Sequence, residues 1–187
     1  MHPGRPARAR AKARHTPGVS KGFTKDDATD EPLVIPARAP LPAGATNYVT
    51  PRGLGLLRAE LADLLHARAR AQAAGGAGDL DATREATVLA TRIGELEIRL
   101  ASAAPVDPAA QPRGEVRFGA TVTVRAEDGT ERRHRIVGVD EADAKAGDVA
   151  FVSPIARALL GKRIGEVAVL RMPRGEDELE VVAIRYD

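Results

Sequence analysis

Two runs of apolar residues at helical spacing, joined by a glycine-rich turn, constrain the fold of this chain more than any other feature. The first run follows Thr50 and Pro51, a pair typical of a helix start because threonine caps well and proline is favoured at the first helical position. Its apolar positions recur in steps of three and four, at Leu54, Leu57, Leu61 and Leu64. This spacing predicts a coiled-coil seam that ends at Gly75 and Gly76.

The second run is predicted to begin near Asp79 or Asp81 and to extend to about Ala103. Its seam comprises Ala82, Ala86, Leu89, Ile93, Leu96 and Leu100, and its outer face carries Arg92, Glu95, Glu97 and Arg99. Two such seams predict an antiparallel coiled-coil hairpin over residues 48–104, with its tip near 74–82. About 22 residues per helix give an arm of roughly 33 Å. The alternative is a pair of helices lying on a larger core, and we favour the arm because few other helices are predicted to cover it.

After a proline-containing linker, residues 105–114, the hydrophobic period changes from helical spacing to alternation. The residues expected to point inward from the first strand are Val116, Phe118, Val122 and Val124. Asp128 and Gly129 form a strong hairpin signal, and three more strands are predicted over residues 149–153, 166–172 and 178–186. A short helix is expected to start at Ser153 and Pro154 and to close at Gly161. The fold class is therefore α+β: a helical hairpin followed by a small antiparallel sheet domain, residues 115–187.

Residues 1–47 are basic, rich in proline and alanine, and without sustained periodicity, which predicts a disordered tail. Within its first 21 residues there is no acid, and the basic residues are Arg5, Arg8, Arg10, Lys12, Arg14 and Lys21. Such a run is either a solvated extension or a non-specific contact to nucleic acid phosphates. The absence of cysteine excludes disulfides and fits a reducing cytoplasm, and no apolar run reaches the ~18 residues of a membrane span.

Several segments resemble one known family. "VRFGATVTV", "RIVGVDEAD", "SPIARALLGKRIGEVAVL" and "EVVAIRYD" are similar to the C-terminal domain of the bacterial Gre transcript-cleavage factors, in order and with natural gaps. Upstream, "SKGFTKDD" and "NYVTPRGLGLLRAEL" resemble the GreB branch of that family. The resemblance covers about three quarters of the chain. It implies an N-terminal antiparallel coiled coil on an FKBP-like domain.

The resemblance also implies a partner, bacterial RNA polymerase, with the globular domain at the rim of its secondary channel. The residues implied at that rim are Ser153, Pro154, Ile155, Ala156 and Arg157. In the family the arm enters the channel, and acids at its tip help to hold a catalytic Mg²⁺ in the polymerase's own active site, where backtracked RNA is hydrolysed. A protein of this kind supplies ligands to another enzyme. It is therefore expected not to be an enzyme and to need no cofactor of its own.

The tip departs from the family pattern of Gly-Asp, two residues, Glu-Asn-Ala, an acid and a tyrosine. Gly78 and Asp79 match the Gly-Asp pair, but the position of the second essential acid is Ala82. The positions that follow it are occupied by Thr83, Arg84, Glu85 and Ala86. The arm is also shorter by one to two turns on each side, on the order of 5 to 10 Å. Asp81 and Glu85 remain candidate substitutes, although acids at a helix start are also ordinary capping residues.

Three hypotheses follow from these residues. The leading one is a regulator of transcription elongation that binds the polymerase secondary channel with weak or no stimulation of transcript cleavage. The second is an active cleavage factor that uses Asp79, with Asp81 or Glu85, to hold the Mg²⁺. The third is a binding module for another partner, because the short arm also resembles a Gre-related regulator of nucleoside diphosphate kinase. In each case we expect a monomer that acts in the cytoplasm without contacting a membrane.

Overall fold

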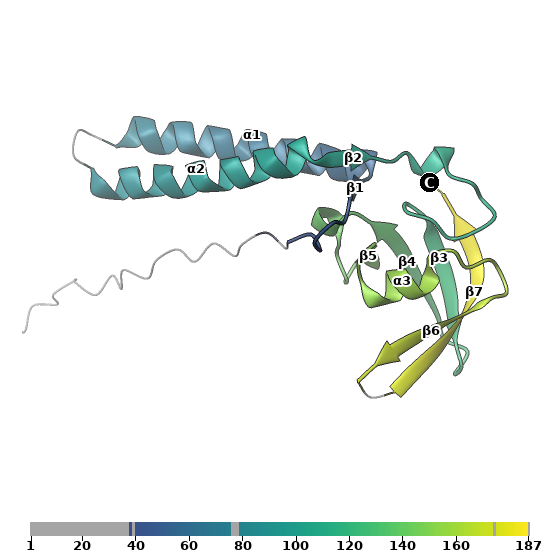
Figure 1. The fold of residues 1–187 in the computed structure, drawn as a ribbon. Helices are drawn as coiled ribbons and strands as arrows, with labels where there is room; N and C mark the ends of the chain where they lie inside the picture. Colours follow the sequence, from purple (N-terminus) through teal and green to yellow (C-terminus); the bar gives the residue numbers. More distant parts are fainter. Residues whose placement is uncertain (1–37, 39, 76–78, 174, 187) are drawn as a thin grey trace, which may run out of the picture. The chain divides into compact units, whose positions relative to one another are not determined.

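The computed structural model describes residue 38 and residues 40–75, 79–173 and 175–186. Most of the predicted N-terminal tail, including its basic run, lies outside the described residues. The described part of the chain is α+β, as expected, with a helical pair followed by a curled sheet and a short helix (Figure 1). Within this part, no helix combines the length and the hydrophobicity that are needed to cross a membrane.

The helical pair consists of α1 (Pro51–Ala74) and α2 (Leu80–Ala101), which lie side by side and antiparallel (Figure 1). Thr50 caps α1 as predicted, because its side chain accepts a hydrogen bond from the N–H of Gly53. The predicted seam lies between the helices. Leu57 and Leu96 are buried in its half nearer the sheet domain, and the leucines packed against them are Leu54, Leu61, Leu64 and Leu100.

Two expectations for the base of this pair are wrong. Arg99, expected on the outer face of the second helix, is only 9% exposed and forms an ion pair with Asp140. The second helix ends at Ala101 rather than near Ala103, because the following residues form a strand. This strand, β2 (Ala103–Pro105), pairs in parallel with β1 (Asn47–Val49). The segments that enter and leave the helical pair are therefore held together by backbone hydrogen bonds.

The sheet has the strand order β5-β4-β3-β7-β6. Its strands are β3 (Thr121–Ala126), β4 (Glu131–Val137), β5 (Asp148–Ala150), β6 (Val167–Met172) and β7 (Gly175–Arg185). The predicted antiparallel sheet is wrong in one pairing, because β5 lies parallel to β4. The connection between them, which contains a 3-10 helix, η2 (Val139–Glu141), brings the chain back only to the level of Arg135, so β5 pairs with the last three residues of β4. The other three pairings are antiparallel.

The core of the sheet domain lies between the sheet and α3 (Pro154–Leu159) (Figure 1). Val122 and Val124 point into it from β3, as predicted. Val116 and Phe118 are buried too, although they precede β3 and are not part of a strand. The hairpin turn is confirmed at Asp128 and Gly129, and Gly129 has a φ of 82°, a conformation that glycine adopts without strain.

Candidate functional site

The carboxylate of Asp79 caps the second helix. Its Oδ1 accepts hydrogen bonds from the N–H groups of Asp81 and Ala82, at 3.1 and 3.0 Å. Its carbonyl oxygen accepts a further bond from the hydroxyl of Thr83, at 2.8 Å. Gly78, the other residue that matches the family pattern, lies outside the described residues. The structure therefore assigns Asp79 the capping role that acids at a helix start commonly have.

The other two candidate acids are exposed and follow Asp79 along the same helix. The side chain of Asp81 is 95% exposed and lies 3.8 Å from a guanidinium nitrogen of Arg84. Glu85 is exposed on the next turn. Within the described residues, no group of three or more acidic or histidine side chains is placed to hold a metal ion. Mg²⁺ requires several oxygen ligands in a near-octahedral arrangement, which these carboxylates do not supply by themselves.

Ala82, at the position of the missing acid, faces the end of the first helix. A Cβ on Gly75 would lie only 2.7 Å from the Cβ of Ala82, so the two helices approach closely here. Small side chains continue along the seam and leave a groove of about 500 Å³ between the helices. The residues that line it include Ala71, Gly75, Ala82, Ala86 and Ala90. This groove at the distal end of the pair is thus lined by small apolar residues together with polar ones, and none of the described leucines lines it.

Of the predicted docking residues at the start of α3, some are exposed and others are buried. Ser153 caps the helix by accepting from the N–H of Ala156 at 3.3 Å, as predicted. Pro154 and Arg157 are exposed, whereas the side chain of Ala156 is fully buried in the core. Ile155 is half-buried against the core. The surface that this helix start offers to a partner therefore centres on Pro154 and Arg157, with Ser153 and Ile155 beside them.

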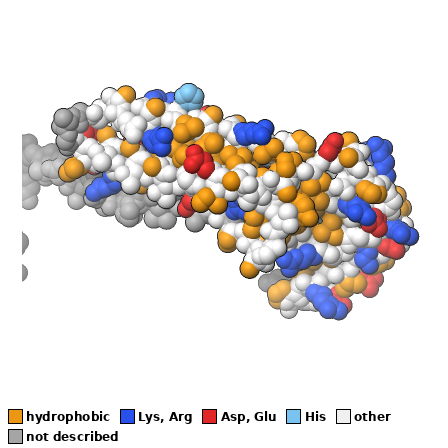
Figure 2. Space-filling model, turned by 45° about the horizontal axis from the view of Figure 1, so that its top comes forward, with side chains coloured by type: hydrophobic (Ala, Val, Ile, Leu, Met, Phe, Trp, Pro, Cys, Tyr) orange, Lys and Arg blue, Asp and Glu red, His pale blue; other side chains and the backbone are white. Residues whose placement is uncertain are grey.

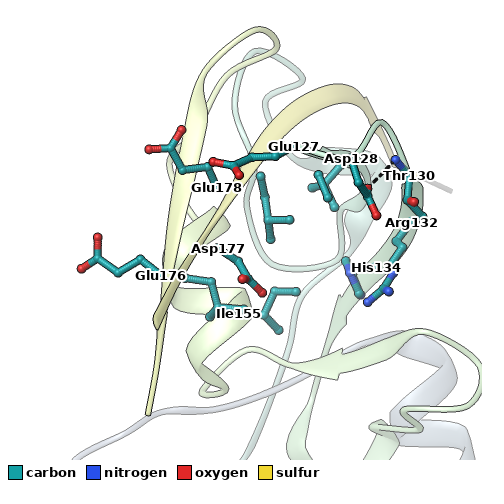
Figure 3. A pocket seen from close by; sticks show the side chains of 13 residues that line it. Glu127, Asp128, Thr130, Arg132, His134, Ile155, Glu176, Asp177 and Glu178 are labelled. Atoms are coloured by element: carbon teal, nitrogen blue, oxygen red, sulfur yellow. Dashed lines mark hydrogen bonds between the residues drawn. The ribbon is translucent and has the colours of Figure 1, made fainter. Parts of the chain in front are cut away.

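A hollow of about 400 Å³ adjoins Ile155 on the sheet domain (Figure 3). Apolar side chains from the sheet and from α3 line it together with acidic ones from the turn between β3 and β4 and from β7. The acidic residues are Glu127, Asp128, Glu176, Asp177 and Glu178. The sequence did not predict this hollow. Its only signal was the acidic character of the two hairpins, which the sequence alone does not bring together.

His134 also lines this hollow. It lies opposite Val122 on the neighbouring strand and is partly buried, and its Nδ1 has no hydrogen-bond partner among the described residues. Burial lowers the pKa of the imidazole below its ordinary value, and the nearby charge of Arg132 lowers it further. His134 is therefore neutral at physiological pH.

Acidic and basic side chains are interspersed on the face of the molecule that Figure 2 shows. On the sheet domain several acidic and basic side chains pair across strands. Arg125, for example, contacts Glu131 at 2.8 Å and Glu180 at 3.3 Å. The described residues on the face that Figure 2 shows therefore form no continuous basic patch of the kind that a nucleic acid backbone attracts.

Comparison with known proteins gives a consistent set of relatives. A family model described as "Transcription elongation factor, GreA/GreB, C-term" matches residues 111–186. Transcription elongation factor GreA of Ralstonia nicotianae is 40% identical over 156 residues, which cover 76% of this chain and 99% of that protein. Transcription elongation factor GreB of Neisseria meningitidis serogroup B is 35% identical over 154 residues, which cover 75% of this chain and 94% of that protein.

One relative that matches over a shorter stretch has a higher sequence identity. Transcription elongation factor GreA of Alkalilimnicola ehrlichii is 50% identical over 97 residues, and the chain spans 61% of that relative's length. Among solved structures, a GreA/GreB factor from Nitrosomonas europaea aligns over 74% of this chain and 98% of its own, with 23% identity and a TM-score of 0.37. GreA factor homolog 1 of Thermus thermophilus aligns over 75% of this chain and 99% of its own, with 24% identity and a TM-score of 0.35.

Proposed function

The chain belongs to the GreA/GreB family of transcription elongation factors, and on that premise we propose that it binds bacterial RNA polymerase at the secondary channel and regulates elongation from there. In this proposal the sheet domain is the family's FKBP-like docking domain, and α1 and α2 are its coiled-coil arm. The protein stimulates transcript cleavage weakly or not at all. Any hydrolysis of RNA takes place in the active site of the polymerase.

The composition of the tip carries the proposal of weak cleavage. Of the two acids that the family pattern requires, only Asp79 is present, and its Oδ1 is occupied by two backbone N–H groups of its own helix. Ala82 replaces the second acid and packs toward Gly75. Arg84 adds a positive charge beside Asp81. Mg²⁺ would be held by the polymerase, and a single capping carboxylate is a poor supplement to its ligands.

The exposed start of α3 supports docking through the sheet domain. Pro154 and Arg157 project from a helix that is pinned to the core by Ala156 and Leu159, both fully buried. A rigid helix start that presents one apolar and one cationic side chain is suited to a small protein contact, since arginine commonly contributes much of the binding energy at interfaces.

Binding to purified core polymerase tests the proposal. We expect the chain to bind and to compete with a GreA protein for the same site. The double variant Pro154→Ala, Arg157→Glu should weaken binding at least tenfold. Arg133→Glu, the same charge change at an exposed position on β4, serves as a control and should bind normally. Lack of binding, or binding without competition, would overturn the proposal.

A cleavage assay separates this function from that of an active factor. If the chain releases short 3′ RNA from backtracked complexes and Asp79→Ala abolishes the release, the tip is catalytically competent and the proposed weak activity is wrong. Recovery of another protein instead of polymerase subunits would favour a binding module outside transcription.

A further inference from the structure

The base of the helical pair meets the sheet domain at a cluster of three aromatic rings. The ring of Tyr48, in β1, has its centroid 5.7 Å from that of Phe118 and 5.6 Å from that of Phe151. The rings of Phe118 and Phe151 are 5.8 Å apart. The chain has three phenylalanines, two tyrosines and no tryptophan, so three of its five aromatic rings meet here. Tilted and edge-on ring pairs at these distances attract each other beyond the effect of buried area.

The base of the helical pair also contacts the sheet domain through backbone atoms. A Cβ on Gly138, at the end of β4, would lie 2.8 Å from the carbonyl oxygen of Tyr48 and 3.6 Å from the Cα of Val49. These are main-chain atoms of β1, which is itself held by its pairing with β2. The contact has no flexible side chain that could yield, so β1 and the corner after β4 are fixed against each other.

Asp140, two residues after Gly138, links the sheet domain to the helical pair. Its carboxylate accepts a hydrogen bond of 2.8 Å from Arg38 and lies 3.4 Å from the Nε of Arg99 on α2. The side chain of Asp140 is 6% exposed and that of Arg99 is 9% exposed. Arg38 in turn binds Glu60 on α1 at 2.6 Å. One buried carboxylate of the sheet domain thus connects to both long helices.

Glu141 makes the corresponding contact with the first turn of α1. Its Oε2 accepts a 2.6 Å hydrogen bond from the hydroxyl of Thr50, and its Oε1 lies 3.6 Å from Arg52. A Cβ on Gly53 would lie 2.6 Å from Oε2, so the helix and the carboxylate are in direct contact. The side chain of Glu141 is only 2% exposed.

We propose that Tyr48, Asp140 and Glu141 are positioning residues that fix the direction in which the helical pair leaves the sheet domain. A different direction would separate these carboxylates from their partners and the Tyr48 ring, itself 39% exposed, from the two phenylalanine rings, and both are unfavourable. The inference rests on the proposed function: once the sheet domain has docked, a fixed contact between the sheet domain and the helical pair determines where the tip lies. These residues then control the effect on the polymerase without touching it.

The absence of cysteine in the native chain makes a direct measurement simple. Spin labels on Gln72→Cys, an exposed site on α1, and on Arg133→Cys, an exposed site on β4, report the distance between arm and sheet domain. For the otherwise native chain we expect one narrow distance distribution. In the double variant Asp140→Asn, Glu141→Gln we expect the distribution to broaden and its mean to shift.

Matched variants distinguish positioning from general destabilisation. Asp63→Asn with Glu97→Gln makes the same chemical changes at exposed acids of the helices and should keep the narrow distribution. Tyr48→Ala should broaden it and Tyr48→Phe should not, and this pair decides the question if the double variant does not fold. A narrow, unchanged distribution in folded Tyr48→Ala, or a broad one already in the native chain, would overturn the inference.

Polymerase provides an independent readout. The double variant Asp140→Asn, Glu141→Gln should bind core polymerase as tightly as the native chain but lose its effect on the elongation rate. Loss of binding and effect together would contradict a positioning role. If the native chain itself does not bind polymerase, the proposed function fails. The distance measurement still decides whether the direction of the helical pair relative to the sheet domain is fixed.

Discussion

The hydroxyl of Thr50 donates a hydrogen bond of 2.6 Å to Oε2 of Glu141 and accepts one of 2.9 Å from the N–H of Gly53. One side chain therefore caps α1 and links that helix to the connection between β4 and β5. The helix start that the sequence predicts from local signals is also part of the contact between the helical pair and the sheet domain.

Replacing Thr50 with valine keeps its shape and removes both hydrogen bonds. We expect the free energy of unfolding to fall by about 2 kcal/mol, because a helix cap is lost and a buried carboxylate loses a donor. Urea unfolding measures the change, and Thr50→Ser, which keeps the hydroxyl, should lose far less. Equal stability of the valine variant and the native chain would show that these bonds contribute little.

Two glycine-to-alanine changes should have opposite effects. Gly138→Ala places a Cβ 2.8 Å from a main-chain oxygen, and we expect it to destabilise the protein by about 1–3 kcal/mol because the backbone must shift. Gly55→Ala lies in an exposed part of α1 with no atom within 4 Å of the new Cβ. It should stabilise the protein by about 0.5–1 kcal/mol through the higher helix propensity of alanine. Chemical denaturation of the two variants in parallel checks the sign of each change.

Leu96 and Ile98 are close in sequence and lie on opposite sides of α2. Leu96 is fully buried in the seam, so Leu96→Ala should cost about 2–5 kcal/mol of stability. Ile98 is 73% exposed, and Ile98→Ala should stay within about 0.5 kcal/mol of the native value. Thermal unfolding followed by circular dichroism distinguishes them. Similar losses in both variants would place the seam elsewhere on the helix.

The depressed pKa of His134 predicts a pH dependence of stability. The imidazole binds a proton less readily in the folded state than in the unfolded chain, so the unfolded state gains protons first as the pH falls. Stability is retained above the unfolded-state pKa and decreases below about pH 6.5. Melting temperatures at about pH 7.5 and about pH 5.5 should differ more in the native chain than in His134→Gln. An equal difference in both proteins would mean that other groups account for the pH dependence.

The features that the sequence predicts correctly depend on neighbouring residues. Thr50 and Ser153 cap the helices they precede, Asp79 caps α2, and Gly129 occupies the turn between β3 and β4. Each depends on an interaction within four residues of chain, so the local sequence contains all the necessary information.

The features that the sequence does not predict depend on partners far along the chain. Arg99 follows the charged pattern of an outer helix face, but it is buried beside Asp140, a partner 41 residues further along the chain. The parallel pairing of β5 with β4 and of β2 with β1 likewise requires segments that hydrophobic periodicity does not relate to each other. At the start of α3, the burial of Ala156 in the core separates exposed from buried residues, and this contact with distant segments is not visible in the local sequence.

Backtracked complexes of bacterial RNA polymerase show whether this chain is a secondary-channel factor of the GreA/GreB family without efficient cleavage. Release of short 3′ RNA is measured with this chain alone, with a GreA protein alone, and with both together. We expect little release by this chain alone and reduced release by the GreA protein in its presence. Rapid release by this chain alone, lost on Asp79→Ala, would contradict this expectation.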